Sequence, residues 1–205
     1  MNKSICIFGA GGFAQEMIFL ATELGYKVDA CLDINNIGST VYNIPVRNED
    51  YFDINKHLAV VAIASPKIRK PITERLVASG AEFVMLVHPS AIISPGVIIG
   101  RGSIVCAFCF ISNGVILGKW TQLNWATTIG HEATLGDFIT TAPGVHISGT
   151  VHMGDSVYMG TNSAIIDKLS ITSNVVIGAG AVVVRDITES GTYIGVPAKK
   201  LIKGI

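Results

Sequence analysis

Residues 117–136, LGKWTQLNWATTIGHEATLG, decide the fold, because an aliphatic residue recurs in them at every sixth position. When hexads are counted from Val87 to Val183, sixteen of the seventeen first positions are aliphatic, and Thr141 is the exception. The fifth position is small or β-branched almost throughout. Neither the 3.6-residue period of a helix nor the two-residue period of a strand produces this pattern. It predicts hexapeptide repeats that build a parallel β-helix.

The hexad pattern has a direct physical interpretation. Each hexad supplies one flat side and one corner, so three successive hexads close one triangular coil. The first position should point inward, where neighbouring coils stack the aliphatic side chains into a dry column. Glycine, which fills several second positions, tolerates the backbone conformations that corners require. At a strand spacing of about 4.8 Å, the hexads predict a prism roughly 27 Å long.

The chain before this repeat has a different character. Short apolar runs predict buried strands, and they lie at residues 4–10, 27–33, 57–65 and 81–87. Apolar residues at helical spacing predict helices, and they lie at residues 11–26 and 67–79. Gly25 suits the position just after the first helix, and the second helix is expected to begin near Pro71 or to be interrupted by it. The alternation predicts a small Rossmann-like α/β domain over residues 1–86, followed by the β-helix domain over residues 87–205.

A glycine-rich turn follows the first predicted strand. Its sequence, GAGGFA, spans residues 9–14 and fits the dinucleotide fingerprint G-x-G-x-x-[G/A], and Asp33 ends the next strand. Exposed N–H groups and a helix N-terminus attract phosphate at such a turn. About 86 residues are too few for the two mononucleotide-binding halves of a full dinucleotide fold. An oxidoreductase module is therefore an alternative and not the leading interpretation.

The composition excludes several classes of protein. Lys plus Arg and Asp plus Glu are equal at 15 each, which favours neither a nucleic-acid nor an anionic-membrane partner. Charged residues make up only 15% of the chain, so part of the surface is expected to be covered by oligomerisation. No apolar stretch is long enough to span a membrane, and the N-terminal apolar run is too short for a signal peptide. We therefore expect a cytoplasmic protein.

The four cysteines are expected to be reduced thiols in the core. Cys106 and Cys109 form the sequence CAFC, but no second pair of ligands is spaced to complete a zinc site. His146 and His152 lie six residues apart, which places them on successive sides of the prism. The close pair with a distant third histidine that a γ-carbonic anhydrase needs is absent. The sequence predicts no metal.

One hexad carries an adjacent base and acid, His131 and Glu132, at its third and fourth positions. These corner positions should face outward. One coil further, Gly149 follows His131 in the same column, and Gly114 lies diagonally below His131. Because both neighbours are glycines, we expect space for a ligand beside the imidazole. Imidazole, with a pKa near 6.5, suits removal of a proton from an amine or hydroxyl that attacks a thioester. The alternative is that His131 has only a structural role.

The chain resembles the sugar O/N-acyltransferase family of left-handed β-helix hexapeptide-repeat acetyltransferases. The resemblance rests on the hexads, on the glycine turn, on the join LVHPSAIISPGVIIG (86–100) and on GVPAKK (195–200). The family includes sialic acid O-acetyltransferases and PglD-like enzymes that N-acetylate nucleotide-linked 4-amino sugars. The resemblance implies left-handed coils and homotrimers with active sites between subunits. It implies His131 as general base, Glu132 as its supporting acid and Asn124 as an acceptor contact.

The resemblance also implies where the two substrates bind. The donor is acetyl-CoA, and its expected contacts are Thr140, Gly149, Gly160, Thr161, Gly178 and Ala179. Among these, Thr140 stands where some relatives carry a donor-contacting histidine. The nucleotide-linked sugar is expected at Gly9, Gly11, Gly12, Phe13 and Asp33. Relatives often have a histidine where Phe13 stands.

These observations together predict an acetyltransferase of polysaccharide or glycan biosynthesis. It would transfer an acetyl group from acetyl-CoA to the amine of a nucleotide-linked amino sugar by direct attack, with no covalent enzyme intermediate. Sugar O-acetylation of the sialic acid type is an alternative, because the same base serves a hydroxyl. A non-catalytic trimeric scaffold and a dinucleotide-binding oxidoreductase are the remaining alternatives.

Overall fold

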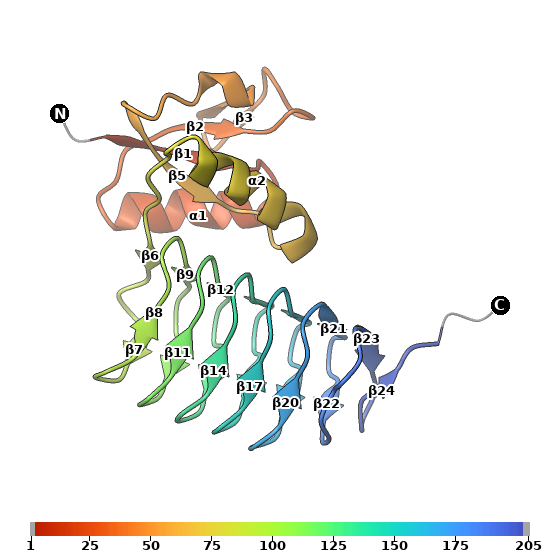
Figure 1. Cartoon of the computed structure of the whole chain (residues 1–205). Coiled ribbons are helices and arrows are strands. Elements are labelled where there is room, and N and C mark those ends of the chain that lie inside the picture. The colour runs from red at the N-terminus through yellow and green to blue at the C-terminus, as the bar shows by residue number, and fades with distance from the viewer. Residues whose placement is uncertain (1–2, 203–205) are drawn as a thin grey trace. The chain divides into compact units, whose positions relative to one another are not determined.

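The computed structural model describes residues 3–202 and divides the chain into two compact units, Met1–Leu86 and Val87–Ile205 (Figure 1). The first unit is an α/β fold. Its elements in chain order are β1 (Ser4–Phe8), α1 (Gly12–Glu23), β2 (Val28–Leu32), β3 (Thr40–Val41), β4 (Ile44–Arg47), the 3-10 helix η1 (Glu49–Tyr51), β5 (His57–Val61) and α2 (Pro66–Ala78).

The sheet of the first unit has the strand order β3-β4-β2-β1-β5. Strand β1 pairs in parallel with both β2 and β5, β4 runs parallel to β2, and the short edge strand β3 is antiparallel to β4. Strand β1 is buried along most of its length, as expected for a central strand of a parallel sheet covered on both faces. The parallel α/β unit expected from the sequence is therefore present.

Three details of this unit differ from expectation or were missed. Helix α2 begins at Pro66, whose missing N–H costs nothing at the first helical position, and it continues through Pro71. The segment 81–87 is not a strand of this sheet, because only Phe83 bridges to Ala59. The hairpin of β3 and β4 was missed. Its turn residues, Tyr42 and Asn43, adopt left-handed backbone conformations.

The second unit is a three-sided parallel β-helix, seen as stacked coils from green to blue in Figure 1. One side, the β7–β22 sheet, contains β7 (Ile92–Ile93), β10 (Phe110–Ile111), β13 (Thr128–Ile129), β16 (His146–Ile147), β19 (Ala164–Ile165) and β22 (Val182–Val183). The second side, the β8–β20 sheet, contains β8 (Ile98–Ile99), β11 (Ile116–Leu117), β14 (Thr134–Leu135), β17 (His152–Met153) and β20 (Ser170–Ile171).

The third side, the β6–β24 sheet, contains β6 (Leu86–Val87), β9 (Ile104–Val105), β12 (Gln122–Leu123), β15 (Thr140–Thr141), β18 (Tyr158–Met159), β21 (Val175–Ile177), β23 (Gly191–Ile194) and β24 (Lys199–Lys200). Strand pairing joins residues one coil apart, as in Thr128 with His146 and Ile129 with Ile147. At the end of the prism β24 turns back antiparallel to β23, and the Ala198 N–H donates to the Val182 carbonyl at 2.7 Å.

The interior of the prism is built from two positions of each hexad. First-position side chains from Val105 to Val183 are almost fully buried, which confirms that they point inward. Fifth-position side chains such as Val115, Ala133 and Val151 are also fully buried, so both positions face the same core. The small or β-branched fifth position is therefore a packing requirement of a narrow prism.

The second-position glycines have a different cause from the one expected. The left-handed backbone conformation belongs to the fourth position of the hexad, as at Glu132, and the second-position Gly130 does not adopt it. A Cβ atom on Gly130 would approach the backbone of Gly149 in the next coil closer than 3.0 Å. Glycine is needed there because adjacent coils touch, and the prediction that it serves corner geometry was wrong.

Candidate active site

His131 and Glu132 form the corner between β13 and β14, which we call the His131 corner. Glu132 adopts a left-handed backbone conformation with φ of 58°. Its N–H donates to the Asn113 carbonyl at 2.9 Å, and the His131 carbonyl accepts from the Thr150 N–H at 2.8 Å. The coils on both sides therefore fix the backbone of this corner.

Both side chains of the His131 corner project outward. The His131 side chain is 61% exposed and the Glu132 side chain is 69% exposed, and His131 Nδ1 lies 3.5 Å from Glu132 Oε2. An exposed imidazole with this neighbour can take a proton from a bound nucleophile, and the carboxylate then stabilises the imidazolium.

Gly149 and Gly114, which were expected to leave space for a ligand beside the imidazole, lie against the side chains of the His131 corner. The ring lies against Gly149 in the next coil, where a Cβ atom would come within 2.7 Å of His131 Nε2. Below, Gly114 faces the Glu132 side chain, with Cγ at 3.4 Å from the position of a Cβ. The two glycines thus make room for the side chains of the His131 corner themselves.

A second group of expected site residues lies at a different corner. Asn124 precedes β13, whereas His131 follows it, so one side of the prism separates them. Thr161 and Ala179 are exposed at the same corner as Asn124 in later coils, beside Gly160 and Gly178. The Asn124 side-chain carbonyl accepts from the Trp125 N–H at 2.8 Å. We call this the Asn124 corner, and a single chain does not bring it to His131.

Thr140 lies at neither corner. It belongs to β15 in the β6–β24 sheet, and it is only 3% exposed.

The glycine turn of the first unit is held by Asp33. The Gly9 N–H donates to the Leu32 carbonyl at 2.8 Å, and the Ala10 N–H donates to Asp33 Oδ2 at 3.1 Å. Gly9 has φ of 115°, and a Cβ there would meet the Ala62 carbonyl oxygen at 3.0 Å. Gly11 caps α1, which starts at Gly12, and Phe13 is half-buried in its first turn. The structure therefore brings together the glycine turn, Phe13's helix and Asp33.

The loop after β5 lies beside this turn, because β5 is the direct neighbour of β1. Arg69 of α2 is 1% exposed, and its Nη1 donates to the carbonyls of Ile63 at 2.7 Å and Ala64 at 3.1 Å. In the sheet, β2 lies on one side of β1 and β5 on the other, so the strand order reverses at β1. Ligands of open α/β sheets bind at the carboxyl ends of the strands where the order reverses. Sequence reasoning missed Arg69, because nothing distinguishes it from the neighbouring lysines.

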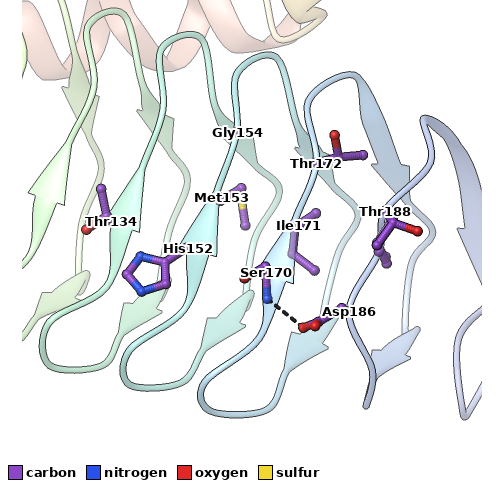
Figure 2. A pocket seen from close by; sticks show the side chains of 10 residues that line it. Thr134, His152, Met153, Gly154, Ser170, Ile171, Thr172, Asp186 and Thr188 are labelled. Atoms are coloured by element: carbon purple, nitrogen blue, oxygen red, sulfur yellow. Dashed lines mark hydrogen bonds between the residues drawn. The ribbon is translucent and has the colours of Figure 1, made fainter.

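A shallow groove crosses the outer face of the β8–β20 sheet (Figure 2). Thr134, His152 and Ser170 line it from three successive strands, and the Ser170 N–H donates to Asp186 Oδ1 at 2.8 Å. The cavity volume is about 520 Å³, and its lining contains no Lys or Arg. The polar side chains of the groove can hydrogen-bond a ligand, and polar sixth positions of the hexads are its signal in the sequence.

The remaining histidines of the prism do not gather. His146 lies on β16 and His152 on β17, on successive sides as expected, and His146 Nδ1 lies 2.8 Å from Thr128 Oγ1. Within residues 3–202, no three His, Cys, Asp or Glu side chains are grouped so that they could hold a metal ion. No helix in that same range is long and apolar enough to cross a membrane.

Both units of the chain are similar to known proteins. Residues 4–76 match the PglD N-terminal domain family. A GDP-perosamine N-acetyltransferase from Escherichia coli O157:H7 is 27% identical over 135 residues, and the match covers 62% of this chain but only 61% of that relative.

Two solved structures are similar over nearly their full length. The acetyltransferase domain of PglB from Neisseria gonorrhoeae FA1090, in complex with acetyl coenzyme A, is 33% identical with a TM-score of 0.91, and the match covers 98% of this chain and 100% of that one. PerB from Caulobacter crescentus, in complex with CoA and GDP-perosamine, is 29% identical with a TM-score of 0.91, and the match covers 100% and 99% of the two chains.

The fold and the corner pair define a hexapeptide-repeat β-helix protein with an α/β unit of the PglD type before it. The chain belongs to the sugar O/N-acyltransferase family, whose prisms are left-handed parallel β-helices. This confirms both the resemblance drawn from the sequence and the fold class.

Proposed function

We propose that this protein is an acetyl-CoA-dependent N-acetyltransferase that acts on the amine of a nucleotide-linked amino sugar. The observation that carries the proposal is the exposed His131 ring with the Glu132 carboxylate at 3.5 Å from Nδ1, fixed at a corner of an acyltransferase prism. Support comes from the similar PerB of Caulobacter crescentus, which was solved in complex with CoA and GDP-perosamine.

In the proposed reaction the neutral amine of the sugar attacks the thioester carbonyl carbon. His131 takes a proton from the nitrogen as the C–N bond forms, and Glu132 stabilises the resulting imidazolium. The C–S bond then breaks, and the imidazolium returns a proton to the leaving sulfur. The products are the acetamido sugar and free CoA, and the protein forms no covalent bond in either step.

The nucleotide is proposed to bind at the glycine turn of the first unit. Backbone N–H groups of Gly11, Gly12 and Phe13 lie at the N-terminus of α1, which favours a phosphate. The Asp33 carboxylate already accepts the Ala10 N–H, so its proposed contribution is to hold the turn in shape.

The acetyl donor is proposed to contact the Asn124 corner, at Gly160, Thr161, Gly178 and Ala179. Because that corner and the His131 corner are separated by one side of the prism, a second copy must bring them together. The outer face of the intervening β7–β22 sheet supports this, since Ile92 and Phe110 pair on it and are 62% and 43% exposed. We propose a homotrimer with active sites between subunits.

Thr140 and Gly149 were also expected to contact the donor. Thr140 is 3% exposed and lies at neither corner, and Gly149 lies against the His131 ring, so the proposal does not include them as donor contacts. Acetyl-CoA and nucleotide-linked sugars are cytoplasmic metabolites, and we propose that the protein works in the cytoplasm.

The experiment measures thiol release from acetyl-CoA with a panel of nucleotide-linked 4-amino sugars. Removal of a general base should lower the rate roughly 10²- to 10⁴-fold in His131→Ala. Asp167→Ala is the matched control, because Asp167 is an exposed residue in the same corner column. Full activity of His131→Ala would contradict the mechanism. Turnover of a hydroxyl sugar alone would support O-acetylation, and binding of a nicotinamide dinucleotide would support the oxidoreductase alternative.

A further inference from the structure

Gly149 is in direct contact with the candidate base. A Cβ atom built on Gly149 would lie 2.7 Å from Nε2, 2.8 Å from Cε1 and 3.1 Å from Cδ2 of His131. Its three nearest neighbours are all atoms of the imidazole ring. The ring therefore occupies the space that a side chain at residue 149 would need.

The backbone does not explain why residue 149 is glycine. Gly149 does not adopt the left-handed conformation that favours glycine at corners. Gly149 is also the only glycine at a third position among the hexads from Val87 to Val183. In the same column Asp167 stands one coil later and Asn113 two coils earlier, so the corner accepts side chains.

Gly149 also differs from the second-position glycines. A Cβ on Gly130 or Gly118 would meet backbone atoms of the next coil, which reflects close stacking of the coils. A Cβ on Gly149 would meet a side chain that is otherwise 61% exposed and has room to move toward solvent. The feature that requires glycine at 149 is thus the orientation of His131.

We propose that Gly149 is a positioning residue for His131. Its bare backbone lets the ring lie across the next coil, with Nε2 over Gly149 and Nδ1 toward the Glu132 carboxylate. The two contacts together fix the direction in which Nε2 accepts a proton. This inference rests on the proposed function, in which Nε2 is the proton acceptor.

The first test is the kinetics of Gly149→Ala. A methyl group must displace the ring, and a displacement of about 1 Å at a reacting group costs up to roughly 10²-fold in rate. We expect kcat to fall about 10²-fold, with KM for both substrates and the melting temperature little changed. Alanine already stands at the third positions of residues 107 and 179, so the corner accommodates it. Asp167→Ala should leave all of these values unchanged.

A double-mutant cycle separates this role from others. If Gly149 acts only through His131, Gly149→Ala should have no further effect in the His131→Ala background. An equal loss in both backgrounds would overturn the inference, since Gly149 would then act on a substrate or on the fold. If His131→Ala keeps full activity, the proposed function fails and the inference about catalysis fails with it.

The geometric part is tested without turnover. The ring current of His131 should shift the Gly149 Hα resonances of the wild-type protein, and His131→Ala should abolish that shift. Gly149→Ala should move the His131 ring resonances, whereas Asp167→Ala should not. Unchanged resonances would overturn the proposed contact whatever the kinetics show.

Discussion

The Asp33 carboxylate accepts the N–H of Ala10 at 3.1 Å, so the end of β2 holds the glycine turn that follows β1. Asp33→Ala removes this acceptor and should loosen the turn. We expect the dissociation constant for the nucleotide-linked sugar to rise about tenfold, and the free energy of unfolding to fall by about 1 kcal/mol. Isothermal titration calorimetry measures the first and urea unfolding the second.

Asp53→Ala is the matched control, because Asp53 Oδ1 accepts the Asn55 N–H in a similar turn away from the glycines. Its affinity for the sugar nucleotide should equal that of the wild type. An Asp33→Ala protein with unchanged affinity would show that the turn keeps its shape without the carboxylate.

The Tyr51 hydroxyl donates to Asp29 Oδ2 at 3.0 Å, beside the buried ring of His57. Burial alone would raise the pKa of Asp29, but bonds from Tyr51, Lys27 and His57 hold that pKa below its usual value. A lowered carboxyl pKa stabilises the fold above the unfolded pKa of about 3.9, and this stability is lost as the pH falls through the folded pKa.

Tyr51→Phe should therefore lower the free energy of unfolding at pH 7 by about 0.5–1 kcal/mol, a modest loss because the hydroxyl is partly screened by solvent. The difference from wild type should shrink in urea titrations below about pH 4, where the carboxylate becomes protonated. Tyr42→Phe, at a side chain that is 71% exposed, is the control and should behave as wild type. A constant difference at every pH would mean that Tyr51 acts by packing alone.

The cysteine thiols should be unreactive in the folded protein. Burial raises the pKa of Cys6 to about 12 and those of Cys31 and Cys109 to about 11, so little thiolate exists at pH 8. Alkylation followed by mass spectrometry should find these residues unmodified in the native state and fully modified in urea. Rapid native labelling at any of them would mean that its surroundings open, and would contradict the assignment to a closed core.

Substitution by alanine should destabilise the prism by different amounts at glycines that touch the next coil and at glycines with a positive φ. In Gly118→Ala the new methyl group meets the Gly136 backbone, and overpacking of this kind costs roughly 1–3 kcal/mol. In Gly180→Ala the methyl group meets nothing within 4 Å, but φ of 66° carries a strain of about 1 kcal/mol. The melting temperature of Gly118→Ala, measured by thermal unfolding, should therefore be lower than that of Gly180→Ala. The reverse order would indicate that neighbouring coils can separate easily at residue 118.

The sequence was sufficient for the architecture of the prism, because its period fixes which residues stack. Val105, Ile111 and Leu117 could be assigned to the interior, and His131 and Gly149 to one column, from spacing alone. The period does not give side-chain rotamers, so it could not show that the His131 ring itself fills the space over Gly149. The period also could not distinguish glycines that are required because the next coil touches them from glycines that are required because their backbone has a positive φ.

The α/β unit was less accessible to sequence reasoning where elements are short. The β3–β4 hairpin has strands of two and four residues, too short to show an alternating pattern. Pro71 looked like a helix boundary, yet α2 continues through it from Pro66 to Ala78. Arg69 donates to carbonyls only five and six residues earlier in the chain, but the composition of this segment does not distinguish it from the neighbouring lysines.

The pairing of each residue with the one a full coil later also governs how such a chain can change length in evolution. Duplication of one complete coil adds a layer and leaves every later side chain on its original face. Duplication of a single hexad before His131 would rotate the rest of the prism by one side and move the His131 corner to another edge of the prism relative to the earlier coils. Descendants of this chain should therefore grow or shrink by whole coils.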